Sequence, residues 1–288
     1  RSTNTTGGPG QGISIANDST TEPLEVRVEQ MRVEIPGGDH GIRAGSGSSG
    51  PVRIEVTDSF FETIGDGSGQ PACIFLDPPS SPLELVATGN HLRFSRASGI
   101  VLDPSTAAPI TATIDGNRVE GFVSEAGVGR TGIDVGGPNA PGDIRATAFA
   151  TNNLFVDADA ALEVNGQAEN DLTVLFANNT AVGAGFAGVY VATFGTSSAE
   201  VSLYNNVLVG GEIGIGVFQS SGTTALVDAG HNLLFDSVTA YDGIAAAPTD
   251  VAADPQFVDA ASGDYRLLAG SPAIDAGANT PPGGTLPA

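Results

Sequence analysis

Hydrophobic and polar positions alternate along this 288-residue chain in a short phrase that returns eight times. The phrase runs apolar, any, apolar, two residues, a small polar residue, any, apolar, as in Val201–Leu208 and Val227–Leu234. Successive copies are separated by 28, 31, 27, 36, 26, 27 and 26 residues. Such alternation is typical of β-strands, and a repeat of this length is typical of a solenoid. Each repeat therefore predicts one coil of a column of stacked strands.

A second phrase follows about ten residues after the first and reads glycine, isoleucine or valine, any residue, apolar. It is clearest at Gly132–Val135, Gly188–Val191 and Gly214–Val217. Two or three short strands per repeat, without a helical period, predict one coil of a parallel β-helix. We therefore expect an all-β column of about eight coils over residues 12–245, with a closing segment and tail over residues 246–288, in a single domain 1–288.

The polar residue of the first phrase is asparagine in six of its eight copies. The chain must turn there, and asparagine tolerates the left-handed conformation better than most residues. Amides stacked one coil apart can also bond to one another, as in the ladders of stacked strands. We expect an interior, structural ladder rather than a ligand site, formed by Asn90, Asn117, Asn153, Asn179, Asn206 and Asn232.

Charge narrows the choice of partners. The chain has 33 Asp and Glu against 11 Arg and no Lys, a net charge of −22. This charge argues against nucleic acid and anionic membranes, which bind basic surfaces. No apolar run is long enough to span a membrane. The acidic, lysine-free composition fits a secreted protein, a saline environment or a GC-rich genome. The chain opens on Arg1 rather than Met, which indicates a processed or cut product, and Cys73 is expected to be a small buried residue.

The coils resemble those of bacterial right-handed parallel β-helix repeat proteins, the superfamily that includes pectate lyases and polygalacturonases. The repeats that carry this resemblance cover about residues 12–245. A closing stretch, Asp254–Asp259, Gly263–Leu267 and Gly270–Gly277, is similar to the C-terminal segment of exported, surface-anchored β-helix proteins. The resemblance implies secretion or a place on the cell surface. It implies no single activity, because fold does not fix function.

Enzyme chemistry finds little support in the residues. The Asn-Thr-Asp, Asp-Asp, Gly-His-Gly and Arg-Ile-Lys signatures of polygalacturonases are absent, and without lysine only arginine could act as a lyase base. Outward positions of the first strands pair Arg53 with Glu25 and Glu84, and Arg27 with Glu55, as expected of cross-strand ion pairs. We predict no catalytic residue and no cofactor, and we lean against an enzyme.

Acidic turns are the candidates for calcium, which prefers oxygen ligands. Asp157 and Asp159 are the first pair, and Asp250 with Asp254 and the loop 65–69 are alternatives. None of them has the spacing of an EF-hand or of a glycine-rich nonapeptide repeat. We therefore expect solvated acids and predict no metal site, with calcium as a weak alternative.

Outward residues after the asparagine change character along the column. They are charged in the third and fourth coils and apolar in the later ones, at Leu154, Val156, Val182, Val207, Val209, Leu233 and Phe235. We call these seven residues the apolar stripe. Parallel strands with apolar outer residues are normally covered on both faces, so we expect the tail to cover the stripe. Ile13 and Ile15 enter the column in mid-coil, which predicts completion by a second copy and head-to-tail association.

Two functions remain open on these residues. The first is an extracellular structural, assembly or cell-surface module, such as a filament subunit, whose partner is another copy of itself. The alternative is a protein that binds or cleaves a polysaccharide of the cell envelope or the extracellular space. A groove of converging carboxylates would favour the alternative, and concentration-dependent oligomers would favour the first.

Overall fold

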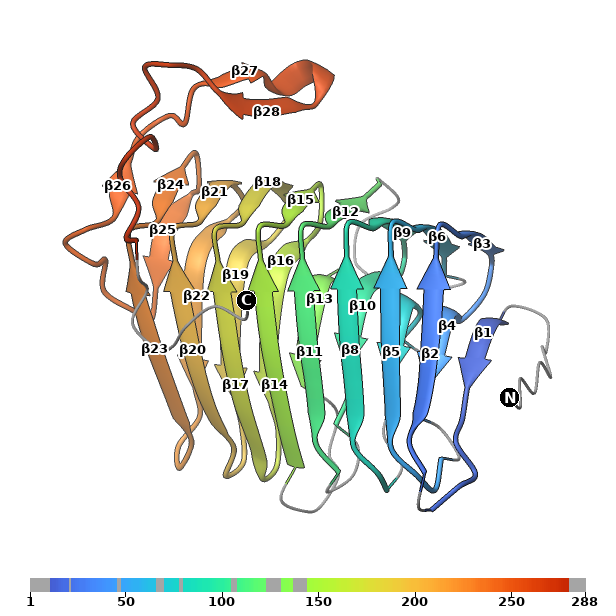
Figure 1. Ribbon diagram of the computed structural model, residues 1–288. Coiled ribbons are helices and arrows are strands. Elements are labelled where there is room, and N and C mark those ends of the chain that lie inside the picture. The colour runs from blue at the N-terminus through green and yellow to red at the C-terminus, as the bar shows by residue number, and fades with distance from the viewer. Residues whose placement is uncertain are drawn as a thin grey trace.

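Three parallel sheets wind around one column in the computed structural model, which describes residues 11–20, 22–45, 48–65, 70–77, 80–104, 108–122, 131–136 and 144–279 (Figure 1). Within these residues the sheets, here called A, B and C, have nine, eight and nine strands. Each coil contributes one strand to sheet B, so the column has eight coils, as the repeats predict. The regular helix in the described part is one short 3-10 turn, η1 (Ala260–Ser262).

Sheets A and B hold the second and first phrases of each repeat. Sheet A consists of β1 (Gln11–Ile15), β4 (His40–Ala44), β7 (Ala72–Leu76), β10 (Ser98–Leu102), β13 (Thr131–Gly136), β16 (Ala160–Gly166), β19 (Ala187–Thr193), β22 (Ile213–Gln219) and β25 (Thr239–Asp242). Sheet B consists of β2 (Leu24–Glu29), β5 (Val52–Thr57), β8 (Leu83–Thr88), β11 (Ile110–Asp115), β14 (Ile144–Thr151), β17 (Asn170–Ala177), β20 (Ser198–Tyr204) and β23 (Thr224–Gly230). Each strand pairs in parallel with the equivalent strand of the next coil.

Sheet C follows sheet B after a sharp corner. It consists of β3 (Arg32–Pro36), β6 (Phe60–Ile64), β9 (His91–Ser95), β12 (Arg118–Gly121), β15 (Leu154–Val156), β18 (Thr180–Ala184), β21 (Val207–Gly210), β24 (Leu233–Phe235) and β26 (Val251–Ala252). The antiparallel hairpin of β27 (Phe257–Asp259) and β28 (Asp264–Leu267) then lies over the outer side of sheet C (Figure 1).

Alternation along each strand fills the core. In β5 and β8 every second residue is buried, which places Ile54 and Leu85 inside the column. Phe61 and Phe155 are among the largest fully buried side chains. Cys73 is buried as expected, and burial raises the pKa of its thiol to about 12, so it is a packing residue and not a reactive thiolate.

The asparagines lie inside the corner between sheets B and C. Their side-chain amides bond from coil to coil at 2.9 to 3.2 Å, and each is at most 2% exposed. The expected left-handed conformation, however, is wrong for these residues. It belongs to the residue before each of them, such as Asn178 with a φ of 58° and Asn205 with a φ of 58°. The turn is made one position earlier, which leaves the ladder amides free to point inward.

Both ends of the ladder are closed by other residues. At the start, the backbone N–H of Ser59 donates to Asn90 Oδ1 at 3.0 Å. At the end, Asp250 Oδ1 accepts from the backbone N–H of Asn232 at 2.8 Å, and Asp250 Oδ2 accepts from the Tyr241 hydroxyl at 2.8 Å. Asp250 therefore occupies the next ladder position, and both of its carboxylate oxygens take part in structural hydrogen bonds.

Candidate functional site

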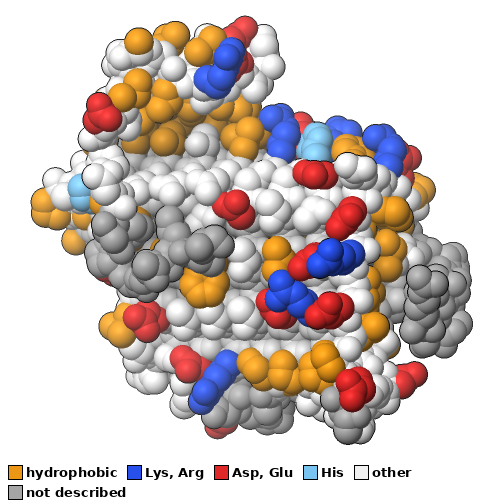
Figure 2. Space-filling model, in the orientation of Figure 1, with side chains coloured by type: hydrophobic (Ala, Val, Ile, Leu, Met, Phe, Trp, Pro, Cys, Tyr) orange, Lys and Arg blue, Asp and Glu red, His pale blue; other side chains and the backbone are white. Residues whose placement is uncertain are grey.

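The apolar stripe lies beneath the closing segment. Val156 and Leu233 are buried, Leu154 is half-buried, and Phe235 is 37% exposed. Leu154 shares a pocket with Tyr265 of the hairpin. Figure 2 shows hydrophobic side chains gathered where the hairpin meets the column. The chain's own segment therefore covers the part of the stripe around Leu154, Val207 and Leu233, as expected from the sequence, whereas Phe235 remains exposed.

Hydrogen bonds hold the segment after the hairpin against the corner of the column. Asn205 donates to the Ala278 carbonyl at 2.9 Å and accepts from the Ala278 N–H at 2.7 Å. His231 Nδ1 lies 2.8 Å from the Ala276 carbonyl.

In the first coil, Ile15 is buried and Ile13 is half-buried. Head-to-tail association through these two residues stays a prediction.

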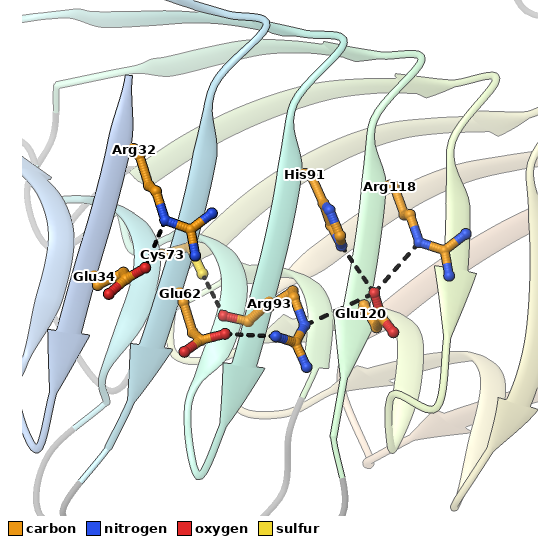
Figure 3. A network of polar contacts seen from close by, with 8 residues as sticks. All are labelled: Arg32, Glu34, Glu62, Cys73, His91, Arg93, Arg118 and Glu120. Carbon is orange, nitrogen blue, oxygen red and sulfur yellow. Dashed lines mark hydrogen bonds and ion pairs between the residues drawn. The ribbon is translucent and has the colours of Figure 1, made fainter. Parts of the chain in front are cut away.

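The uncovered part of sheet C carries a network of charges (Figure 3). Arg32 pairs with Glu34 at 2.6 Å, and Arg93 pairs with Glu62 at 2.6 Å. Because these pairs are at the surface, each contributes about 0–1 kcal/mol.

Glu120 is the centre of that network. Its Oε2 lies 2.8 Å from His91 Nε2 and 3.3 Å from Arg118 Nε. Burial opposes its ionisation, but the hydrogen bond from His91 and the charge of Arg118 outweigh burial and lower the pKa of Glu120. The network compensates its own charges.

Sheet B carries the ion pairs expected from the sequence. Arg53 bonds to Glu84 and lies 3.2 Å from Glu55, and Arg27 lies 3.0 Å from Glu55. Figure 2 shows basic and acidic side chains alternating on the face of the column that sheet B forms. The expectation of cross-strand pairs is confirmed for these residues.

The outer face of sheet A holds a group of acids that was not predicted from the sequence. Asp134 and Glu163 lie side by side in register on β13 and β16. Asp103 follows β10, two residues beyond the partner of Asp134, and lies diagonally from it. A pocket of about 220 Å³ opens here, lined by Gln70, Pro71, Arg96, Ala97, Ser98, Val101, Thr131, Asp134, Glu163 and Asn165. We call it the sheet A pocket.

Burial and like charges raise the pKa of Asp134 in this pocket and of Asp103 beside it. Asp134 Oδ1 is enclosed and has no hydrogen-bond partner among the described residues. Burial, with the charges of Glu163 and Asp103, raises the pKa of Asp134 well above its ordinary value. Burial, and then the charge of Asp77, raises the pKa of Asp103 to about 6. Burial therefore favours the protonated form of Asp134, which can donate a hydrogen bond.

Uncharged and paired groups complete the face. Thr131 Oγ1 donates to Glu163 Oε2 at 3.0 Å. Towards the N-terminal end, Arg43 pairs with Asp77 at 3.2 Å. His40 stacks on an aromatic ring there, and burial, with the charge of Arg43, lowers its pKa to about 4, so it is neutral. A signal for this site was present in the sequence, because Asp134 and Glu163 occupy the "any" position of the second phrase.

The calcium candidates do not converge. Asp157 has a left-handed backbone with a φ of 52°, and burial, with the charge of Glu120, raises its pKa. No group of three or more His, Cys, Asp or Glu side chains is arranged to hold a metal in the part of the chain that is described. Residues 66–69 of the third candidate loop lie outside the described residues. That these turns hold no metal stays a prediction, with calcium at Asp157 and Asp159 as the alternative.

Fold and pocket together define a parallel β-helix with a polar recess on one sheet. The family model of the right-handed β-helix region matches residues 72–245, and the chain belongs to this family. No curated protein and no solved structure matches the chain. No helix among the described residues is long and apolar enough to cross a membrane.

Proposed function

We propose that this protein is an extracellular β-solenoid module that binds a polysaccharide on the outer face of sheet A. The sheet A pocket carries the proposal, because Asp134 and Glu163 from adjacent coils line one recess and the pKa of Asp134 is raised well above its ordinary value. Pockets that contain perturbed carboxyl groups are good candidates for functional sites.

The chemistry of the pocket suits sugar hydroxyls, which both donate and accept hydrogen bonds. Asp134, whose raised pKa favours the protonated form, can donate, and the carboxylate oxygens of Glu163 can accept. Ser98, Thr131 and Asn165 add neutral polar groups to the lining. Strands of successive coils are about 4.8 Å apart, so a polymer of repeated units can lie along the column across several of them.

Affinity gel electrophoresis with soluble polysaccharides tests the proposal. We expect at least one polymer to retard the protein and Asp134→Ala to weaken this binding. Asp134→Asn should retain much of it, because an amide donates as the protonated acid does. Glu200→Ala removes an exposed acid of sheet B and serves as the matched control. Retardation that Asp134→Ala leaves unchanged would refute the role of the pocket.

Measurement of reducing ends in the same samples separates binding from cleavage. An increase that Asp134→Asn abolishes would make the protein an enzyme, and intact polymer would keep it a binding module. The extracellular location rests on the resemblance of residues 254–277 to closing segments of exported proteins, and fractionation of the producing cells tests it.

A second candidate function is end-to-end assembly. β23 and β25 are edge strands within the described part of the chain, and core residues beside them are only half-buried, including Val217, Val227 and Tyr241. Edge strands with partly exposed core residues are templates for pairing. Sedimentation velocity over a dilution series should show concentration-dependent oligomers. A monomer at every concentration would exclude this function.

A further inference from the structure

Aromatic rings gather on the same face of sheet A as the pocket. Tyr190 follows Glu163 in register one coil along, and Phe218 belongs to the neighbouring outward column. Phe186 packs against Tyr190 with ring centroids 5.1 Å apart, and Phe194 packs against Phe218 at 5.4 Å. We call these four rings the aromatic patch.

The patch is open to solvent. Phe186 is 37% exposed, Phe194 39% and Phe218 45%, although a soluble chain normally buries such rings. Exposed apolar groups that are contiguous rather than scattered are typical of binding surfaces. The patch lies on the same face as the sheet A pocket, because Tyr190 shares an outward column with Asp134 and Glu163.

A glycine fixes the position of the central ring. Gly216 is the next residue of the Tyr190 column, and a Cβ atom added to it would lie 2.7 Å from Cδ2 of Tyr190. The tyrosine ring therefore lies on the backbone of β22, and any larger residue at position 216 would displace it. Burial, with the charges of Asp242 and Glu163, raises the pKa of Tyr190, so its hydroxyl stays protonated.

We infer that the aromatic patch is the stacking part of the polysaccharide site and that the polymer is an uncharged chain of pyranose sugars. This inference rests on the proposed function. The C–H faces of a pyranose ring carry weak positive charge and pack on the negative faces of aromatic rings. An uncharged polymer is also not repelled by Asp103, Glu163 and Asp242, whereas a uronate polymer would be.

The two parts are spaced for one extended ligand. Asp134, Glu163, Tyr190 and Gly216 occupy four consecutive coils in one column. Three steps of about 4.8 Å place the ends of this track roughly 14 Å apart. Hydrogen bonds at the acidic end and stacking at the aromatic end can therefore act on neighbouring sugars of a single chain.

Affinity gel electrophoresis with mixed-linkage β-glucan, galactomannan and xylan, and with polygalacturonate as the charged comparison, tests the inference. We expect a neutral polymer to retard the wild-type protein, and Tyr190→Ala and Phe218→Ala each to weaken binding about tenfold. Gly216→Ala should weaken binding as well, and Tyr190→Phe should retain it. Phe235→Ala removes an equally exposed ring from sheet C and is the matched control.

Each other outcome identifies which idea fails. Binding of polygalacturonate alone would overturn the substrate class and leave the pocket standing. Binding of a neutral polymer that Tyr190→Ala and Phe218→Ala leave intact, with the fold verified by circular dichroism, would overturn the role of the patch. Absence of binding to every polymer would overturn both proposals. If Phe218→Ala then also dissolved a dimer seen by sedimentation, the occupant would be a second copy of the chain.

Discussion

Replacement of Asn179 by leucine tests whether the ladder holds the column together. Asn179 Oδ1 accepts from the backbone N–H of Asn153 at 2.9 Å and from its amide at 3.0 Å. Its own amide donates to the Ala150 carbonyl at 2.9 Å and to Asn206 Oδ1 at 3.2 Å. All of these bonds are buried, so water cannot replace them at once.

The magnitude follows from the groups that would lose a partner. In Asn179→Leu the backbone N–H of Asn153 and one of its amide hydrogens remain unsatisfied, and the Ala150 carbonyl loses its bond to the side chain. Asn206 Oδ1 still accepts from the backbone of residue 179. Two unmet donors at about 1–3 kcal/mol each, offset in part by the apolar surface of leucine, give a loss of about 1–3 kcal/mol.

Urea unfolding followed by far-UV circular dichroism measures the loss. Asn178→Gly is the matched control, because the neighbouring residue has a φ of 58° that glycine adopts without strain. We expect the control to lose less than about 1 kcal/mol. Because repeat proteins can open locally, hydrogen exchange of β14 and β17 should rise in Asn179→Leu. An equal, small loss in both variants would refute the argument that the ladder amides depend on one another.

Three further predictions follow from the acids, the closing segment and the calcium candidates. The raised pKa of Asp103, about 6 against 3.8, means that the folded state binds this proton more tightly than the unfolded state. Its contribution to stability is therefore full below pH 3.8 and is lost as pH rises to about 6. Asp103→Asn should therefore reduce this pH-dependent fall in the free energy of unfolding by about 1–2 kcal/mol, as measured by urea unfolding at several pH values. Identical pH profiles for the variant and the wild-type protein would contradict this prediction. A chain ended after residue 253 should expose the apolar stripe and bind more of the dye ANS, and unchanged fluorescence would show that the segment does not cover it. Calcium added after chelation should leave the melting temperature unchanged, and a rise lost in Asp157→Asn would establish a metal site.

The fold could be predicted from the local periodicity of the sequence. Side chains of a strand alternate between two faces, and stacked coils must repeat their corner residue, so the phrase around Asn179 was sufficient to predict coils, core and ladder. The pairing of Arg53 with Glu84 followed from the same alignment, because equal positions in successive phrases become neighbours. The covering of Leu154 followed from apolar residues on an outward face.

Other features depend on contacts that no local pattern contains. Asp250 closes the ladder from only 18 residues beyond Asn232, outside the repeat spacing, because the chain shortens its last coil. The left-handed residue at each corner precedes the asparagine, since the amide must point inward to reach the next coil.

The sheet A pocket and the aromatic patch show this limit most clearly. Asp134, Glu163 and Tyr190 each fill a position of the second phrase that admits any residue, so each looks unremarkable within its own repeat. The sequence by itself determined which residues face outward. Only the tertiary structure decided which of them meet, because loops of different length connect the coils, and burial and mutual charge act only after the strands are stacked in register.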